Sequence, residues 1–288
     1  IELAAKASVP VVSLMEKIPG MNFSGIDNQS AVCTLVEHLI TRHHCRTINY
    51  IHGPESSYED QQRFLAYRDT LLSYKVPFEP ERVTGQNYEI ETGIHAFYEF
   101  RDKGLLPDAF VCANDNIAVG VCLAAEKSGY KIPDDFLITG CDNENKASFF
   151  NPRITTVGFS KAEVMYNALK LFHDIWDNKD VSDHIYAPVT HVFQESCHCT
   201  PANPADRGQY VANSIMSEVH QSDMQNWMME LDRYLLDCTS FTELAEHLHT
   251  WLSTHGCGNL SLLMNPDIFL LGKIDALAEI PDDLYLDF

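Results

Sequence analysis

The chain has 288 residues, of which 45% are hydrophobic, and it carries a formal net charge of −21 with an isoelectric point near 4.8. This length suits one large domain or two of ordinary size, and the apolar content excludes a wholly disordered chain. A chain this acidic is repelled by DNA phosphates and by anionic membrane surfaces. We therefore expect no contact with nucleic acid or membrane from these residues themselves.

The nine cysteines are odd in number and scattered through apolar stretches. This pattern favours reduced thiols in a cytoplasmic protein over a disulfide framework. The first residues lack the charged and apolar regions of a signal peptide, and no apolar run reaches the length of a membrane span.

Short apolar runs alternate with amphipathic stretches along the first 200 residues, which predicts a parallel sheet with helices on both faces. Strands are expected at residues 9–14 (VPVVSL), 48–53 (INYIHG), 108–113 (DAFVCA) and 136–141 (FLITGC). Apolar spacing of three and four predicts helices at residues 30–41, 59–74, 90–101, 117–128 and 162–176.

Polar pairs follow two of these strands where each strand ends: Asn114 with Asp115, and Asp142 with Asn143. Parallel strands joined by a helix bring their carboxyl ends to one rim, where ligands of such sheets bind. Carboxylates beside amides suit a ligand rich in hydroxyls, such as a sugar. A residue just before a helix can instead cap it, and we assign that role to Asp115 rather than Asn114.

The motifs ANDNIAVG, KIPDDFLITGCDN and NPRITTV occur in this order after VPVVSL, GIDNQSAVCTLVEHLI, RTINYIHGP and QQRFLAYRDTL. This series resembles the ligand-binding core of LacI/GalR-type transcription regulators, which is itself similar to periplasmic sugar-binding proteins. The resemblance covers about the first two-thirds of the chain. It implies an α/β, two-lobed periplasmic-binding-protein-like (type I) fold with parallel sheets.

The resemblance also implies a domain organisation. Residues 1–200 would form the ligand-sensing domain, with a first lobe at about 1–46 and 160–180 and a second at about 47–155 and 185–199. The chain would cross between the lobes three times. The first lobe would lack its N-terminal strands and the helix-turn-helix that precedes them, so we interpret the chain as a segment of a longer protein. Residues 201–288 would form a helical linker and the start of a GAF-like signalling domain.

The resemblance points to three ligand-binding residues and two weaker candidates. Arg63 matches the arginine that reaches ligand hydroxyls, and its guanidinium offers several donors in a fixed fork. Its plainer alternative is a surface arginine. Asn114 and Asp142 match the rim amide and carboxylate that bind the sugar. Asp27 and Ser30 are weaker candidates on the rim of the first lobe.

We expect neither a metal nor a cofactor. Cys197 and Cys199 flank His198, but two thiolates one residue apart make a poor pair for one tetrahedral ion, and no second pair with zinc-site spacing follows. A similar SC-x-C ending marks a domain boundary in multidomain signalling proteins. None of the thirteen histidines belongs to a recognised catalytic motif, so we expect no enzymatic activity here.

The resulting hypothesis is a cytoplasmic sensor of a small molecule, a sugar or related metabolite. Ligand would close the lobes, change the geometry of a homodimer and so control an attached output domain. That output would be DNA binding through an upstream helix-turn-helix, or a downstream diguanylate cyclase of the GGDEF type. The linker and the helical extension after residues 195–199 (ESCHC) favour the second, because ordinary repressors of the family that the sequence resembles end soon after this point. A transport-type solute-binding protein is disfavoured by the scattered cysteines and the C-terminal extension.

Overall fold

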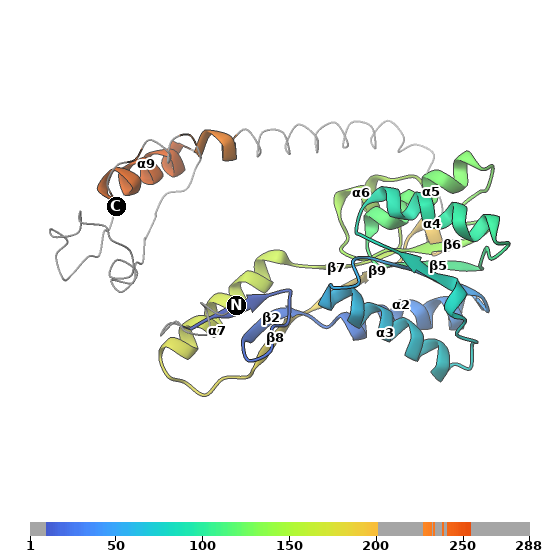
Figure 1. The fold of residues 1–288 in the computed structure, drawn as a ribbon, viewed down its shortest axis with the longest axis horizontal. Coiled ribbons are helices and arrows are strands. Elements are labelled where there is room, and N and C mark those ends of the chain that lie inside the picture. Colours follow the sequence, from blue (N-terminus) through green and yellow to red (C-terminus); the bar gives the residue numbers. More distant parts are fainter. Residues whose placement is uncertain (1–9, 201–226, 232, 234–237, 239–240, 255–288) are drawn as a thin grey trace. The chain divides into compact units, whose positions relative to one another are not determined.

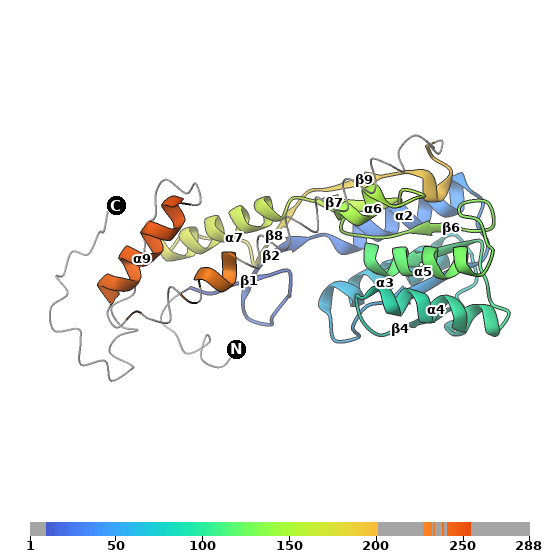
Figure 2. The same ribbon diagram turned by 90° about the horizontal axis from the view of Figure 1, so that it is seen from above.

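A computed structural model of the protein describes residues 10–200, 227–231, 233, 238 and 241–254 (Figure 1). The chain divides into two compact units, Ile1–Ser214 and Ile215–Phe288, which are described separately. The first unit contains two α/β lobes, each built on its own parallel sheet (Figures 1 and 2). The predicted α/β fold class is therefore confirmed.

The first lobe is a three-stranded parallel sheet in the order β1-β2-β8, with one helix packed on it. Its elements are β1 (Val12–Leu14), β2 (Asn22–Ile26), β8 (His184–Ala187) and α7 (Lys161–Trp176). Ile26, Val164 and Ala187 form its small buried core. The buried hydroxyl of Ser24 donates to the Val164 carbonyl at 2.8 Å, which fastens the helix to the sheet.

The second lobe is a four-stranded parallel sheet in the order β4-β3-β5-β6 with helices on both faces. Helices α2 and α3 lie against one face, and α4 and α5 against the other (Figure 1). The elements are α2 (Asn28–Arg42), β3 (Ile48–His52), α3 (Tyr58–Ser73), η1 (Pro80–Arg82), β4 (Val83–Gly85), α4 (Ile90–Asp102), β5 (Ala109–Cys112), α5 (Asp115–Lys127), β6 (Leu137–Thr139) and α6 (Asn145–Phe149). One continuous hydrophobic core joins the sheet to these helices.

The chain passes between the lobes three times, as expected. It leaves the first lobe between β2 and α2, returns between β7 (Thr156–Phe159) and α7, and leaves again between β8 and β9 (Val189–Val192). Strands β7 and β9 pair antiparallel, so two of the three connections run side by side. The last described segment of this unit, η2 (Glu195–Cys197), packs on β6 of the second lobe.

The predicted position of the first crossing is wrong. Residues 1–46 were assigned to the first lobe, yet α2 packs on α3, and Val36 and Leu39 are fully buried in the core of the second lobe. The crossing lies about twenty residues earlier, directly after Ile26. Similarly, β8 was assigned mostly to the second lobe but pairs with β2. Apolar spacing shows that a helix buries one face, but not which of two sheets covers it.

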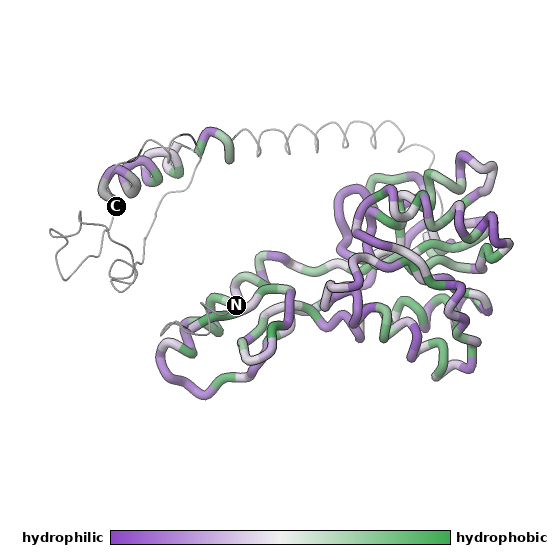
Figure 3. Tube along the Cα trace, in the orientation of Figure 1, coloured by the Kyte–Doolittle hydropathy of each residue, from purple (hydrophilic) through white to green (hydrophobic). Residues whose placement is uncertain are grey.

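Helix starts follow from local sequence. Four helices begin after a residue whose side-chain oxygen accepts from a first-turn backbone N–H: Asp27, Ser57, Asn114 and Ser160. Such caps satisfy one of the unpaired N–H groups at a helix start. Figure 3 shows apolar and polar stretches alternating along the helices, as amphipathic packing requires.

The second unit contributes α9 (Phe241–Thr254) to the description, which confirms the helix expected from residue 241. Several predicted segments lie outside the described residues. They are most of the linker after residue 200, the N-terminal part of the long helix between that linker and α9, and the strands after residue 258. The boundary near residue 200 and the GAF-like identity therefore remain predictions. Among the described residues, no helix is both long and apolar enough to cross a bilayer.

Candidate ligand pocket between the lobes

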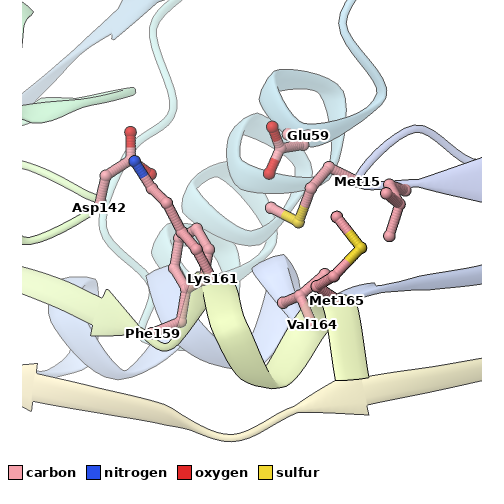
Figure 4. A pocket seen from close by; sticks show the side chains of 8 residues that line it. Met15, Glu59, Asp142, Phe159, Lys161, Val164 and Met165 are labelled. Atoms are coloured by element: carbon pink, nitrogen blue, oxygen red, sulfur yellow. The ribbon is translucent and has the colours of Figure 1, made fainter. Parts of the chain in front are cut away.

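A pocket of about 360 Å³ lies between the two lobes (Figure 4). The second lobe contributes Glu59 of α3 and Asp142, which follows β6. The remaining lining residues belong to the first lobe or to the β7–α7 crossing: Leu14, Met15, Phe159, Lys161, Val164 and Met165. In Figure 4 the carboxylate of Glu59 and the thioethers of Met15 and Met165 point toward one another across this space. One wall is therefore acidic, and the facing wall is mostly apolar.

Arg63 lies behind the acidic wall and holds it in place. Its side chain is 2% exposed, which excludes the alternative of a surface arginine. Its Nη2 donates to Asp142 Oδ1 at 3.1 Å and to Glu59 Oε1 at 3.4 Å. Its Nε donates to Asn28 Oδ1 at 2.7 Å, and its Nη1 to the Ala113 carbonyl at 2.6 Å. The guanidinium thus connects the ends of β5 and β6 to α2 and α3.

Arg63 pairs with both carboxylates of the acidic wall, and Lys161 on the facing side brings a second positive charge to the pocket lining. Two carboxylates share one guanidinium, because Glu59 and Asp142 both pair with it. Burial raises the pKa of Glu59 above its ordinary value; Arg63 opposes this shift, and the charge of Asp142 adds to it. Such a wall favours a ligand that brings hydrogen-bond donors, since a carboxylate that gains a donor is stabilised in its charged form.

The loop after β6 contains two residues with a strained backbone, Asp142 and Asn143. Asp142 has φ +102° and Asn143 has φ +48°, both in the region that non-glycine residues rarely adopt. The Asp142 N–H donates to the Val157 carbonyl at 2.8 Å, which ties the loop to β7. A Cβ at Gly158 would lie 2.9 Å from the Asn143 Cβ, so only glycine leaves room for this turn. Strain of this kind is concentrated at binding and catalytic sites.

The expectation that Asp115 rather than Asn114 caps a helix is wrong. Asn114, not Asp115, caps α5: its Oδ1 accepts from the Ile117 N–H at 3.0 Å, and its amide donates to the Tyr88 carbonyl at 3.0 Å. Asp115 instead accepts from the Thr156 hydroxyl at 2.6 Å and from the Glu144 N–H at 2.8 Å. The Asp115 carboxylate is therefore buried between β7 and the loop that follows β6. Ligand contact by Asn114 remains a prediction, and Asn114 does not line the pocket.

The two weaker candidates lie outside the pocket lining. Asp27 Oδ1 accepts from the Ser30 N–H at 3.0 Å, so Asp27 caps α2, and both side chains are exposed at the first crossing. Of the five predicted site residues, Arg63 and Asp142 are therefore joined directly. Asn114 follows Ala113, whose carbonyl accepts from Arg63.

Sequence reasoning missed Glu59 and the apolar wall. Glu59 is one helical turn before Arg63, a spacing at which two side chains on a helix meet, and this could have identified it. Met15 directly follows β1, at the same kind of strand end that identified Asp142. Val164 and Met165 gave no such signal, because apolar residues on a helix usually pack in a core.

The periplasmic binding protein-like domain family matches residues 36–197, which is more than half of the chain. The chain belongs to this family. The LacI-type resemblance of the sequence is thereby confirmed.

Three known proteins are compared with this periplasmic binding protein-like chain. The NTD biosynthesis operon regulator NtdR of Bacillus subtilis is 30% identical over 174 residues, which cover 60% of this chain and 53% of that protein. The Lac repressor dimer bound to operator and an anti-inducer has a TM-score of 0.62 at 20% identity, covering 67% of each chain. The regulator CelR in complex with cellobiose has a TM-score of 0.61 at 22% identity, covering 65% of this chain and 59% of that one. The chain spans about half the length of the curated relatives that it matches.

Proposed function

We propose that residues 10–200 form the sensing domain of a cytoplasmic transcription regulator, and that they bind a small hydroxylated molecule between the lobes. The observation that carries this proposal is the pocket itself, which has Asp142 and Glu59 on one wall and a methionine-rich surface on the other. Its volume of about 360 Å³ is of the size used for small ligands, about 300–1,000 Å³.

The pocket's chemistry fits a sugar or a nucleoside-like metabolite. The carboxylates of Asp142 and Glu59 accept hydrogen bonds from ligand hydroxyls, and Arg63 keeps both carboxylates oriented. The apolar C–H face of a sugar ring would lie against Met15, Phe159 and Met165. The cellobiose complex of a protein with the same fold supports a sugar as ligand.

Ligand would act by drawing the lobes together. Groups on both lobes line the pocket, so a molecule that contacts both walls binds the closed arrangement more tightly than an open one and shifts the population toward it. The movement would occur at the three connections between the lobes. We propose DNA binding by a homodimer as the controlled output, because the matched relative is an operon regulator and the Lac repressor, with the same fold, is a dimer on its operator.

Isothermal titration calorimetry of the full-length protein against mono- and disaccharides and nucleosides tests the ligand proposal. We expect at least one compound to bind with one site per chain. Asp142→Asn should weaken its binding roughly 10- to 100-fold, because a hydrogen bond to a charged group contributes about 1.5–3 kcal/mol. Asparagine also tolerates the positive φ at this position, so the loop keeps its shape.

Asp69→Asn is the matched control, because Asp69 is an exposed carboxylate on the same helix as Glu59 and pairs with the neighbouring Arg68. It should leave the affinity unchanged. The ligand identified in this way should also change the affinity of the full-length protein for its operator in a gel-shift assay. If no compound binds, or if both variants bind as tightly as the unsubstituted protein, the pocket is not the sensing site.

A further inference from the structure

A second cluster of chemically active side chains shares no residue with the ligand pocket. His38 lies on α2, His43 is the first residue after that helix, and Cys197 and Cys199 follow β9 at the end of the described part of the first unit. One side-chain nitrogen or sulfur atom from each of these four residues lies within 4.8 Å of the other three. We propose that these four residues bind a structural Zn²⁺ ion.

The spacing of the four atoms fits tetrahedral coordination. Zinc binds histidine nitrogen at about 2.0–2.1 Å and thiolate sulfur at about 2.3 Å, so tetrahedral ligand atoms lie roughly 3.3–3.8 Å apart. His38 Nε2 is 3.0 Å from His43 Nε2, 3.1 Å from Cys199 Sγ and 3.9 Å from Cys197 Sγ. Cys199 Sγ is 3.4 Å from His43 Nε2. The two remaining separations, from Cys197 Sγ to Cys199 Sγ and to the His43 ring nitrogen, are within 4.8 Å, so Cys197 is the ligand that would move most when an ion binds.

The backbone around the two cysteines is shaped to bring their sulfurs together. His198 between them has φ +60°, in the left-handed region, and this reverses the chain after η2. The N–H of Cys199 donates back to the Gln194 carbonyl at 3.1 Å. Two thiolates one residue apart are expected to make a poor pair for one ion, but this turn brings both sulfurs within 3.9 Å of His38 Nε2. The partners also lie far upstream in the sequence rather than downstream, where a second pair was sought.

Groups around the cluster complete a second layer of the kind that metal sites use. The buried hydroxyl of Thr155 accepts from the Gln194 N–H at 2.8 Å, which leaves its own hydrogen free to donate to Cys197 Sγ, also at 2.8 Å. The ring of His38 stacks on Phe193 with centroids 4.0 Å apart, which fixes the direction of its nitrogen. The hydrogen bond from Thr155 to Cys197 Sγ and the fixed orientation of the His38 ring both favour metal binding by this cluster.

The chemical types of the four ligand atoms indicate which ion the site would bind. Two thiolates and two imidazoles in tetrahedral arrangement are typical of structural zinc sites, whereas Mg²⁺ and Ca²⁺ require oxygen ligands. With four protein ligands no coordination position is left for a substrate, so the site would be structural. It would fasten the end of α2 to the segment that leaves the sensing domain after β9. His43 also lines a hollow of the surface, together with His198.

The experiment is metal analysis of the full-length protein, expressed without a polyhistidine tag in zinc-supplemented medium and purified without chelators. We expect about one zinc per chain by inductively coupled plasma mass spectrometry. After zinc removal, Co²⁺ alone should restore the visible absorption bands of a tetrahedral cobalt–thiolate centre.

Four variants separate a built site from surface binding. Cys199→Ser and His43→Asn, both at partly exposed positions, should weaken Co²⁺ binding more than about 100-fold, beyond the 10–100-fold loss typical of second-layer changes. Cys33→Ser and His44→Asn are matched controls, because neither residue belongs to the cluster, and should retain one ion per chain. Circular dichroism reports whether each variant folds.

The proposal is overturned if the protein carries less than about a tenth of an equivalent of zinc and Co²⁺ gives no thiolate bands. It is equally overturned if the control variants lose as much metal as the cluster variants, since that result means adventitious binding. A mass two daltons lower, mapped to a Cys197–Cys199 disulfide, would also contradict it. None of these outcomes depends on whether the ligand pocket binds a sugar.

Discussion

Arg63 is a side chain that could be singled out in the sequence, although its contacts could not be predicted. Its position in QQRFLAY, early in a helix after a strand, places it correctly at the rim of the second lobe. Its side chain is buried, pairs with Glu59 and Asp142 and does not line the pocket, so contact between Arg63 and a ligand remains a prediction. Helical periodicity predicts which face of a helix is buried, but it does not reveal how far a long side chain extends or which carboxylates it meets.

The exchange between Asn114 and Asp115 has a similar cause. Both residue types cap helices, so the sequence alone cannot say which of two neighbours stands at the boundary. The strand β5 ends at Cys112, and the chain needs two more residues before α5 begins, which makes Asn114 the cap. Asp115 is then left inside the first turn, 1% exposed, with its carboxylate directed at Thr156.

The burial of Asp115 predicts a pH-dependent stability. Burial raises its pKa to about 8, and the hydrogen bonds from Thr156 and from the Glu144 backbone only partly oppose this shift. An unfolded aspartate has a pKa of about 3.9, so between about pH 4 and 8 the folded state keeps a proton that the unfolded state has lost. The free energy of unfolding should therefore fall as pH rises through this window, by up to about 1.4 kcal/mol per pH unit.

Asp115→Asn tests this expectation, because asparagine has the size of the protonated acid and stays uncharged over this pH range, while its oxygen can still accept from the Glu144 N–H. Urea unfolding at several pH values should show the variant gaining stability relative to the unsubstituted protein as pH rises from 4 to 8. The exposed Asp69→Asn should show no such gain. A constant difference between Asp115→Asn and the unsubstituted protein across this range would mean that Asp115 is ionised in the folded state.

At the scale of elements, the positions of most strands and helices could be predicted from the sequence. The sheet that each strand joins, or that each helix covers, could not. The expected helices near residues 30–41, 59–74, 90–101 and 162–176 all occur with small shifts at their ends. The sequence did not show that α2 covers the second sheet, because its apolar stripe would suit either lobe. The pairing of β8 with β2 was missed for a related reason, since HIYA has no feature that distinguishes the two sheets.

The contact between α4 and α5 provides a test of packing at this scale. A Cβ added at Gly93 of α4 would lie 2.0 Å from the Ile117 carbonyl oxygen of α5, so the two backbones approach as closely as glycine allows. Gly93→Ala should force the helices apart and lower the free energy of unfolding by about 2–3 kcal/mol, despite the higher helix propensity of alanine.

His95→Ala is the control on the same helix, because His95 is exposed, and it should change the stability by no more than about 0.5 kcal/mol. The measurement is the urea midpoint of each variant at neutral pH. Equal stability of Gly93→Ala and the unsubstituted protein would show that the close approach of these helices is not required for the fold.

At the scale of the whole molecule, the account depends on the two lobes sharing one ligand. The family resemblance and the rim residues indicated a cleft, and the structure places Asp142 and Glu59 opposite Met15 and Met165. The chemical identity of the ligand could not be predicted, because the apolar wall is formed by residues whose types are equally common in cores. The cluster of His38, His43, Cys197 and Cys199 could not be predicted either, since its two halves are more than 150 residues apart in sequence.

The most direct measurement is a crystal structure of the full-length protein with the compound that binds most tightly in calorimetry. The account predicts density for that compound between the lobes, with its hydroxyls within hydrogen-bond distance of Asp142 or Glu59 and its apolar face against Met15 and Met165. Density for the compound at any other surface, with this pocket filled only by water, would contradict it.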